Sequence, residues 1–206
     1  MDNLVDEIKE DLKKEQLLKI WKEYGNYIIG VIIALVFSGI GYVYWDYSQE
    51  KLRLELAQAY ESAVRETDPK IQKNAFDKLA GSALKGYSVI GVFEAAEISS
   101  DPVAAYRQIA RDTRHDQVFR DFALLKAILK ELPTGDPHSL LDEISALTKK
   151  ATPWRESAFE IEATLYLMAG KVEQALDLFE TLAKSKSAPR GVQQRSRIML
   201  DLANNR

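Results

Sequence analysis

The sequence predicts an all-α protein in which one membrane-spanning helix precedes a solenoid of stacked helical hairpins. Residues 25–45 form an apolar run without a charged side chain, and the dipeptide Asp-Pro recurs after it at intervals of 33 and 35 residues. No strand-like alternation of apolar and polar residues competes with the helical periodicity. The composition, 46% apolar and 29% charged over 206 residues, is that of a chain that buries a core.

The run from Gly25 to Trp45 has the length and the flanks of a membrane span. Its 21 residues would extend roughly 30 Å as a helix, which matches the hydrocarbon core of a bilayer. A buried helix of a soluble protein and a cleaved signal peptide are the alternatives. The charged segment before the run and the bulky aromatics on both sides favour a retained anchor. These aromatics are Trp21, Tyr24, Tyr27, Tyr42, Tyr44, Trp45 and Tyr47.

Basic residues near the ends of the span predict its orientation. Four lysines precede it closely, at positions 13, 14, 19 and 22, whereas only Lys51 and Arg53 follow it closely. The positive-inside bias therefore places residues 1–24 in the cytoplasm, as a short charged segment, and residues 46–206 across the membrane.

Small residues recur along the span and predict a face on which another helix packs. The alternative is that small residues are simply common in membrane helices. The predicted packing face consists of Gly30, Ala34, Ser38 and Gly41.

The Asp-Pro dipeptides mark an internal repeat. They begin at Asp68, Asp101 and Asp136, and the same register reaches Lys171. Asp caps the start of a helix and Pro fits its first turn, so each dipeptide predicts where a helix begins. Two columns on that helix and two on the preceding helix are apolar except at Gln72. Their apolar members form the predicted repeat core: Leu56, Tyr60, Phe76, Val89, Phe93, Ala105, Ile109, Leu124, Ile128, Leu140, Ile144, Phe159, Ala163, Ala175 and Phe179.

Two helices per repeat of about 34 residues, repeated about four times, predict a solenoid of helical hairpins. The first helix is expected to continue from the membrane helix, since nothing between Trp45 and Leu56 breaks it. The helices are expected over residues 47–66, 69–82, 86–99, 102–113, 117–131, 137–150, 154–169, 172–184 and 190–203.

This period resembles that of tetratricopeptide repeats, and the unit 156–189 fits best. Its small and aromatic residues, its turn glycine and its final proline follow in the usual order: Ala163, Tyr166, Gly170, Ala175, Phe179 and Pro189. The resemblance adds Tyr166 to the predicted repeat core. Asp112 interrupts an otherwise apolar column, so irregular packing is expected in the second unit.

Catalytic chemistry is not indicated. The chain has no cysteine, which excludes thiol catalysis, zinc fingers and disulfides. Its two histidines, His115 and His138, lack a second histidine or a carboxylate cluster at ligand spacing, and neither a nucleophile elbow nor a phosphate-binding glycine loop occurs. We therefore expect no enzyme, cofactor, metal or small-molecule substrate. A net charge of −3 does not favour nucleic acid as a partner.

Two surface features have competing interpretations. The densest basic cluster, formed by Arg107, Arg111, Arg114 and Arg120, could bind an acidic segment. Interleaved aspartates at 112, 116 and 121 favour a solvated face held by salt bridges. Trp154, which follows Pro153, is predicted to pack between repeats rather than to recognise a peptide.

The order of segments resembles the YfgM-type ancillary subunits of the bacterial SecYEG translocon. The local likeness begins at Tyr44-Trp45, continues through Ala57, Tyr60-Glu61 and Ala63, and returns around residues 87–132. The resemblance implies a periplasmic repeat domain, contacts with other envelope proteins such as periplasmic chaperones, and no catalytic residues.

The expected function is therefore that of an interaction protein. It would be anchored in the bacterial inner membrane and would link translocon subunits to a periplasmic chaperone or to secreted client proteins. An envelope scaffold in cell division or cell-wall assembly is the alternative. An enzyme or transporter accessory with a hidden site is a third hypothesis, and no polar constellation in the sequence supports it.

Overall fold

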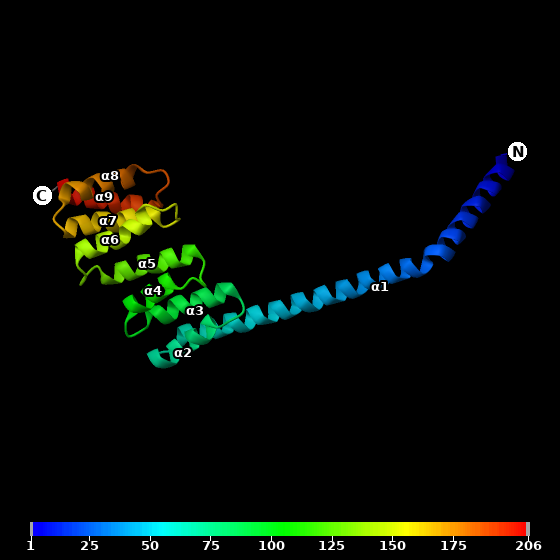
Figure 1. Cartoon of the computed structure of the whole chain (residues 1–206), viewed down its shortest axis with the longest axis horizontal. Coiled ribbons are helices and arrows are strands. Elements are labelled where there is room, and N and C mark those ends of the chain that lie inside the picture. The colour runs from blue at the N-terminus through cyan, green and yellow to red at the C-terminus, as the bar shows by residue number, and fades with distance from the viewer. Residues whose placement is uncertain (1, 205–206) are drawn as a thin grey trace. The chain divides into compact units, whose positions relative to one another are not determined.

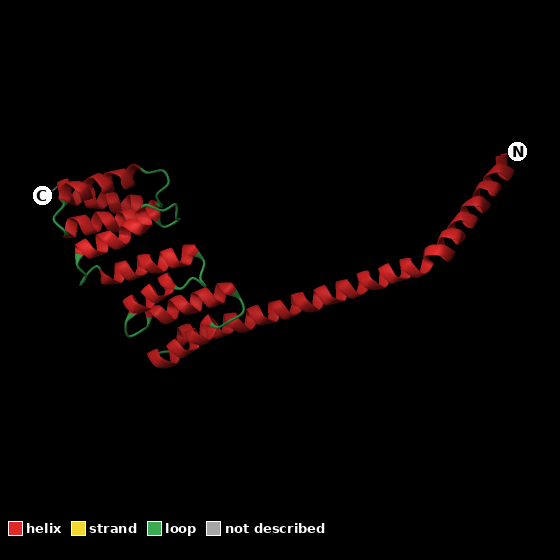
Figure 2. Cartoon of the chain, in the orientation of Figure 1, coloured by secondary structure: helices red, strands yellow, loops and turns green. Residues whose placement is uncertain are grey.

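The structure is a computed structural model that describes the backbone of residues 2–204 and the side chains of residues 18–203 except Ile20, Ile28 and Ile32. Helices and their connections make up this described part (Figures 1 and 2). Two compact units, Met1–Ala57 and Gln58–Arg206, divide the chain. The helices are α1 (Asp2–Arg65), α2 (Pro69–Ala80), α3 (Lys85–Glu97), α4 (Pro102–Arg111), α5 (Gln117–Glu131), α6 (Pro137–Thr148), α7 (Arg155–Met168), α8 (Val172–Lys184) and α9 (Arg190–Asn204).

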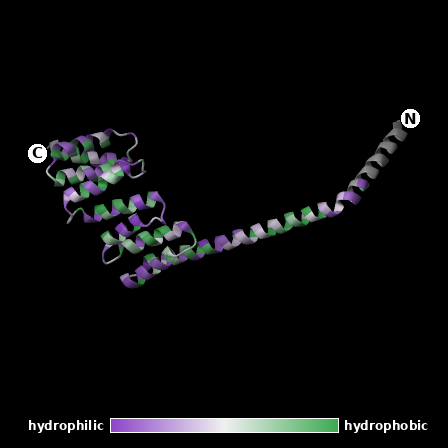
Figure 3. Ribbon diagram, in the orientation of Figure 1, coloured by the Kyte–Doolittle hydropathy of each residue, from purple (hydrophilic) through white to green (hydrophobic). Residues whose placement is uncertain are grey.

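Helix α1 carries the apolar run that was predicted to cross a membrane (Figure 3). Its part Trp21–Arg65 is long and apolar enough to do so, and the most apolar stretch within it is not buried. The helix is continuous to Arg65, so the prediction that it extends into the first helix of the repeats is confirmed. The side chains of residues 1–17, most of the charged segment 1–24, lie outside the described residues.

The second unit is an array of helical hairpins, termed the array below. Together with the long apolar helix before it, this confirms the predicted all-α class. Three of its helices begin as the Asp-Pro dipeptides predict. Asp68 accepts hydrogen bonds from the backbone N–H groups of Lys70 and Ile71, Asp101 from Ala104, and Asp136 from Ser139. Each aspartate thus satisfies donors that the first turn of a helix leaves free.

The fourth repeat starts α8 without such a cap. Gly170 has φ +75°, a left-handed conformation that glycine adopts without strain. The turn lets the Lys171 N–H donate to the Tyr166 carbonyl at 2.8 Å, which closes the end of α7. At this repeat a glycine turn ends the preceding helix, whereas at the other three an aspartate caps the start of the following one.

Several helices end earlier than predicted. Helices α2, α3, α4 and α6 stop two residues short of the expected bounds, at Ala80, Glu97, Arg111 and Thr148. In α4 the reason is Asp112, whose carboxylate accepts the Arg114 N–H at 3.0 Å and so starts a turn. Asp112 therefore caps the end of α4, and the expected irregularity of the second unit is a shortened helix.

Helix α5 packs on two sides. In α5, Ala123 and Ala127 pack with α3 and α4, whereas Leu125 and Ile128 pack with α6 and α7. Four small or branched apolar residues on two faces let one helix join consecutive hairpins into a continuous core.

Helices α2 and α3 cross at very close range. Gly91 is buried, and a Cβ atom there would lie 2.7 Å from the carbonyl oxygen of Phe76 and 2.8 Å from the carbonyl carbon of Leu79. Only a residue without a side chain fits this crossing.

Candidate protein-interaction surface

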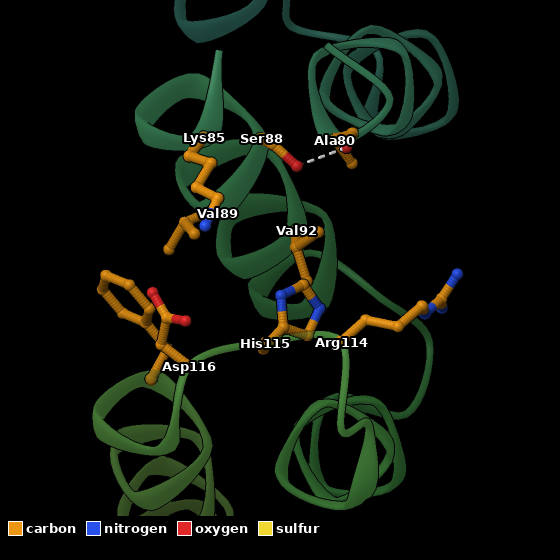
Figure 4. A pocket seen from close by; sticks show the side chains of 9 residues that line it. Ala80, Lys85, Ser88, Val89, Val92, Arg114, His115 and Asp116 are labelled. Atoms are coloured by element: carbon orange, nitrogen blue, oxygen red, sulfur yellow. Dashed lines mark hydrogen bonds between the residues drawn. The ribbon is translucent and has the colours of Figure 1, made fainter. Parts of the chain in front are cut away.

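A cleft of about 420 Å³ opens between α3 and the connection that precedes α5 (Figure 4). Val89 and Val92 of α3 and Phe119 of α5 give it apolar walls. Ser88 donates its hydroxyl to the Ala80 carbonyl at 2.6 Å, which fixes the end of α2 against α3. An exposed apolar surface inside a polar rim is typical of interaction sites and ligand-binding grooves.

The rim of the cleft is charged. Lys85 lies on one side and Asp116 on the other, with His115 between the helices. Arg114 forks onto Asp112, its Nε and Nη2 atoms lying 2.6–3.0 Å from the two carboxylate oxygens. This hydrogen bonding by Arg114 holds the pKa of Asp112 well below its usual range.

A second cleft, of about 320 Å³, shares Ala80, Val92, Arg114 and His115 with the first and reaches α4. Its remaining apolar lining comes from alanines and from Ile109, and Lys73 and Asp77 of α2 form an ion pair at its rim at 2.7 Å. Helices α2, α3, α4 and α5 and the connections 98–101 and 112–116 together line the surface that the two clefts form.

A charged network holds α3, α4 and α5 together. Glu97 accepts a hydrogen bond from the Tyr106 hydroxyl at 2.6 Å and pairs with Lys126 at 2.9 Å and with Lys130. The bond from Lys130, followed by that from Tyr106, lowers the pKa of Glu97 from 4.5 to about 2. Burial, together with Glu97, raises the pKa of Tyr106.

Replacing Glu97 with glutamine should lower the free energy of unfolding at pH 7 by about 1 kcal/mol, since solvent screens a carboxylate that is 35% exposed. The pKa of Glu97 is lower in the folded than in the unfolded chain, so its contribution is present above pH 4.5 and is lost as the pH falls toward 2. Urea unfolding of the intact protein and of Glu97→Gln in a mild detergent, at pH 7 and pH 3, measures this. An equal difference between the two proteins at both pH values would contradict the charge pairing.

The predicted basic cluster divides among different partners. Arg114 pairs with Asp112 as the expected salt-bridged face requires. Arg107 instead reaches Glu131 at 2.6 Å and Glu143 at 2.8 Å, and so links α4 to α5 and α6. The expectation was wrong for Asp121, which is buried and accepts hydrogen bonds from Gln117 and Lys150. The helical period brings Asp121 inward, where Lys150 from the next repeat neutralises it.

Trp154 packs between repeats, as predicted. Its ring stacks on Phe122 with centroids 4.5 Å apart, and its Nε1–H donates to the Val118 carbonyl at 2.9 Å. Both contacts join the start of α7 to α5 across 32 to 36 residues of sequence.

The structure places the residues of the predicted repeat core at two levels of burial. Eight are buried: Phe76, Ile109, Ile128, Leu140, Ile144, Ala163, Ala175 and Phe179. Eight are half-buried: Leu56, Tyr60, Val89, Phe93, Ala105, Leu124, Phe159 and Tyr166. The polar member of the columns, Gln72, donates its side-chain amide to the Ala63 carbonyl at 3.2 Å.

The columns missed a second set of buried residues, among them Ala96, Ala123, Leu125, Ala127 and Ala158. Four of these five are alanines, and pairs such as Ala123 and Ala127 recur at a spacing of four. That spacing was a signal for a second packed face.

The predicted membrane-helix packing face lies on α1, in the first unit. Gly30, Ala34, Ser38 and Gly41 are all exposed there. A Cβ atom at Gly30 or at Gly41 would meet nothing within 4 Å.

Neither histidine belongs to a metal site in the described residues, which hold no group of three or more His, Asp and Glu side chains that could bind a metal ion. His115 lines both clefts, with its Nε2 atom 3.9 Å from Asp112. His138 is exposed on the first turn of α6.

Stacked helical hairpins with an exposed cleft between consecutive helices define a helical repeat protein of the kind that binds other proteins. A family model for the tetratricopeptide repeat-like domain matches residues 19–175. The chain therefore belongs to the tetratricopeptide repeat-like domain family, the YfgM-type family that its sequence resembles. No curated protein and no solved structure matches the sequence.

Proposed function

We propose that this protein is a membrane-anchored interaction module, held by α1 and binding other proteins through the array. The proposal rests on the presence of two parts in one chain. One is an apolar helix whose most apolar stretch is not buried, and the other is a repeat domain with its own core. Tethering raises the local concentration of whatever the array binds beside the membrane.

We further propose that the module serves the Sec translocon from the periplasmic side of a bacterial inner membrane. Its partners there would be translocon subunits and a periplasmic chaperone or secreted client proteins. The YfgM-type resemblance and the bias of basic residues before the span support this assignment. A scaffold in cell division or wall assembly is the second candidate, because the same architecture would serve it.

Affinity purification of the intact protein from detergent-solubilised membranes, beside a version lacking residues 1–45, tests the proposal. We expect translocon subunits or a periplasmic chaperone to copurify with the intact protein. The shortened version shows which partners the array alone retains. Recovery of division or wall-synthesis proteins in their place would overturn the Sec assignment in favour of the scaffold.

The small-residue face of α1 gives a more local test. Gly30→Ile with Ala34→Ile should weaken copurification of a membrane partner, because bulky side chains keep a second helix at a distance. The matched control is Val31→Ile with Leu35→Ile, which alters two exposed and already bulky positions of the same helix. Retention of the partner at full yield by the first variant would show that this face is not an interface.

A further inference from the structure

Basic side chains gather along one edge of the array. Its helices run alternately in opposite directions, so successive connections fall at opposite edges (Figure 1). One edge has the connections 81–84, 112–116, 149–154 and 185–189, and the other has 66–68, 98–101, 132–136 and 169–171. With three residues on each side of every connection, the first edge has ten Lys and Arg against three Asp and Glu. The second edge has four Lys and Arg against seven Asp and Glu. The first is termed the basic edge and the second the acidic edge.

The basic edge is one continuous surface. Its first two connections meet because Lys85 and Asp116 line the same cleft. The third contacts α5 next to the second, where Lys150 pairs with Asp121 at 3.2 Å. The fourth reaches the start of α7, where the Ser187 hydroxyl donates to Glu156 at 3.0 Å.

Most of its cations form no ion pair with the described carboxylates. Six of the ten are exposed and have no carboxylate within 4.0 Å in the part of the chain that the structure describes. They are Lys78, Lys85, Arg111, Lys149, Lys186 and Arg190.

Helix stability accounts for only part of this edge. A cation stabilises the C-terminal end of a helix, and Lys78, Arg111 and Lys184 lie in the last turns of α2, α4 and α8. In contrast, α3, α7 and α9 begin with Lys85, Arg155 and Arg190, at the end where the helix dipole disfavours positive charge. The acidic edge is different, because three of its aspartates cap helices. Local structure therefore explains the capping aspartates of the acidic edge, but it leaves the cations at the starts of α3, α7 and α9 for a partner.

The chain enters the array at the basic edge. The Tyr60 ring lies 6.0 Å from that of Phe76, and Ala63 accepts a hydrogen bond from Gln72, so residues 58–65 run antiparallel to α2. Gln58, the first residue of the array, consequently lies beside the C-terminal end of α2, where the connection 81–84 begins.

We propose that the basic edge binds the anionic lipid headgroups of the membrane that holds α1, an inference that rests on the anchoring proposed above. Cations spread along four connections fit a flat charged surface better than a single peptide, and lysine and arginine near a membrane are attracted by its anionic lipids. Among the described residues, no large apolar side chain exposed on the surface lies in the four connections of this edge or their flanks. The contact is therefore electrostatic and sensitive to salt.

The absence of cysteine makes the edge accessible to single-site labelling of the full chain. A fluorophore on Ala151→Cys reports on the basic edge, and one on Ser100→Cys reports on the opposite edge; both positions are exposed. The protein is reconstituted into vesicles of phosphatidylcholine, alone or mixed with phosphatidylglycerol, that contain an energy acceptor on the headgroup. Flotation with neutral vesicles in about 1 M salt, where the Debye length is about 3 Å, tests the anchoring by itself.

We expect energy transfer from position 151 to rise on anionic vesicles, to fall back in about 1 M salt, and to stay unchanged from position 100. Lys186→Glu with Arg190→Glu should abolish the rise, whereas Lys70→Glu with Lys171→Glu, the same change of charge at the other edge, should preserve it. Equal transfer on neutral and anionic vesicles would overturn the proposal even if the chain floats. If polyglutamate but not anionic lipid changes the signal, the partner of this edge is an acidic protein and the lipid proposal fails.

Discussion

Gly91→Ala is expected to destabilise the array by about 3 kcal/mol, a large effect for one methyl group. The new Cβ would lie 2.7 Å from the Phe76 carbonyl oxygen and closer still to the Ala80 backbone nitrogen. These are backbone atoms, which cannot rotate away as a side chain does, so α2 and α3 must separate. Urea unfolding of the intact protein in detergent gives the loss, and hydrogen exchange should show it first in α2 and α3.

The same helix offers a matched control for this prediction. Gly86 lies on the first turn of α3 with nothing within 4 Å of its position for a Cβ. Gly86→Ala should therefore be neutral or stabilise by up to about 1 kcal/mol, since alanine favours the helix. If both variants lose the same stability, helix propensity rather than close packing governs α3, and the crossing at Gly91 does not constrain it.

The repeat period was readable in the sequence because its signals are local. A capping aspartate and the proline after it act within one turn, so Asp68, Asp101 and Asp136 predicted three helix starts. Helix ends depend on weaker and more varied chemistry. Asp112 illustrates this, because it looked like a misplaced member of an apolar column, yet its hydrogen bond to the Arg114 backbone ends α4.

The second face of the inner helices was harder to predict. A single repeat column records one face of a helix, whereas α5 buries Ala123 and Ala127 on one side and Leu125 and Ile128 on the other. Alanine gives a weak hydrophobic signal, and its spacing is informative only once neighbours on both sides are known.

The two clefts could not be predicted from local sequence patterns. Residues from α3, from the connection 112–116 and from α5 line the first of them, and only tertiary packing brings these segments together. The ion pair that links α4 to α6 is equally distant in sequence, because Arg107 and Glu143 are 36 residues apart. Asp121 was misread for the same reason, because its partner Lys150 comes from the next repeat.

Trp154→Ala is expected to lower the free energy of unfolding by about 3 kcal/mol, near the lower limit for removing a large aromatic, because Trp154 is only half-buried. The substitution removes both the stacking on Phe122 and the hydrogen bond to the Val118 carbonyl. Trp154→Phe separates the two effects: it keeps an aromatic ring against Phe122 and should cost about 1 kcal/mol for the lost hydrogen bond.

These contacts tie α7 to α5 and so form part of the interface between two successive repeats, termed the joint below. Their loss should loosen this interface rather than one helix. Hydrogen exchange in Trp154→Ala should accelerate in the connection 149–154 and at the start of α5 before it does in α8 and α9. In a repeat array, stability is close to a sum of repeats and their interfaces, so a weakened joint lowers the cooperativity of urea unfolding as well as its midpoint. A fall in the midpoint with an unchanged slope and uniform exchange would instead show that the joint unfolds only with the whole array.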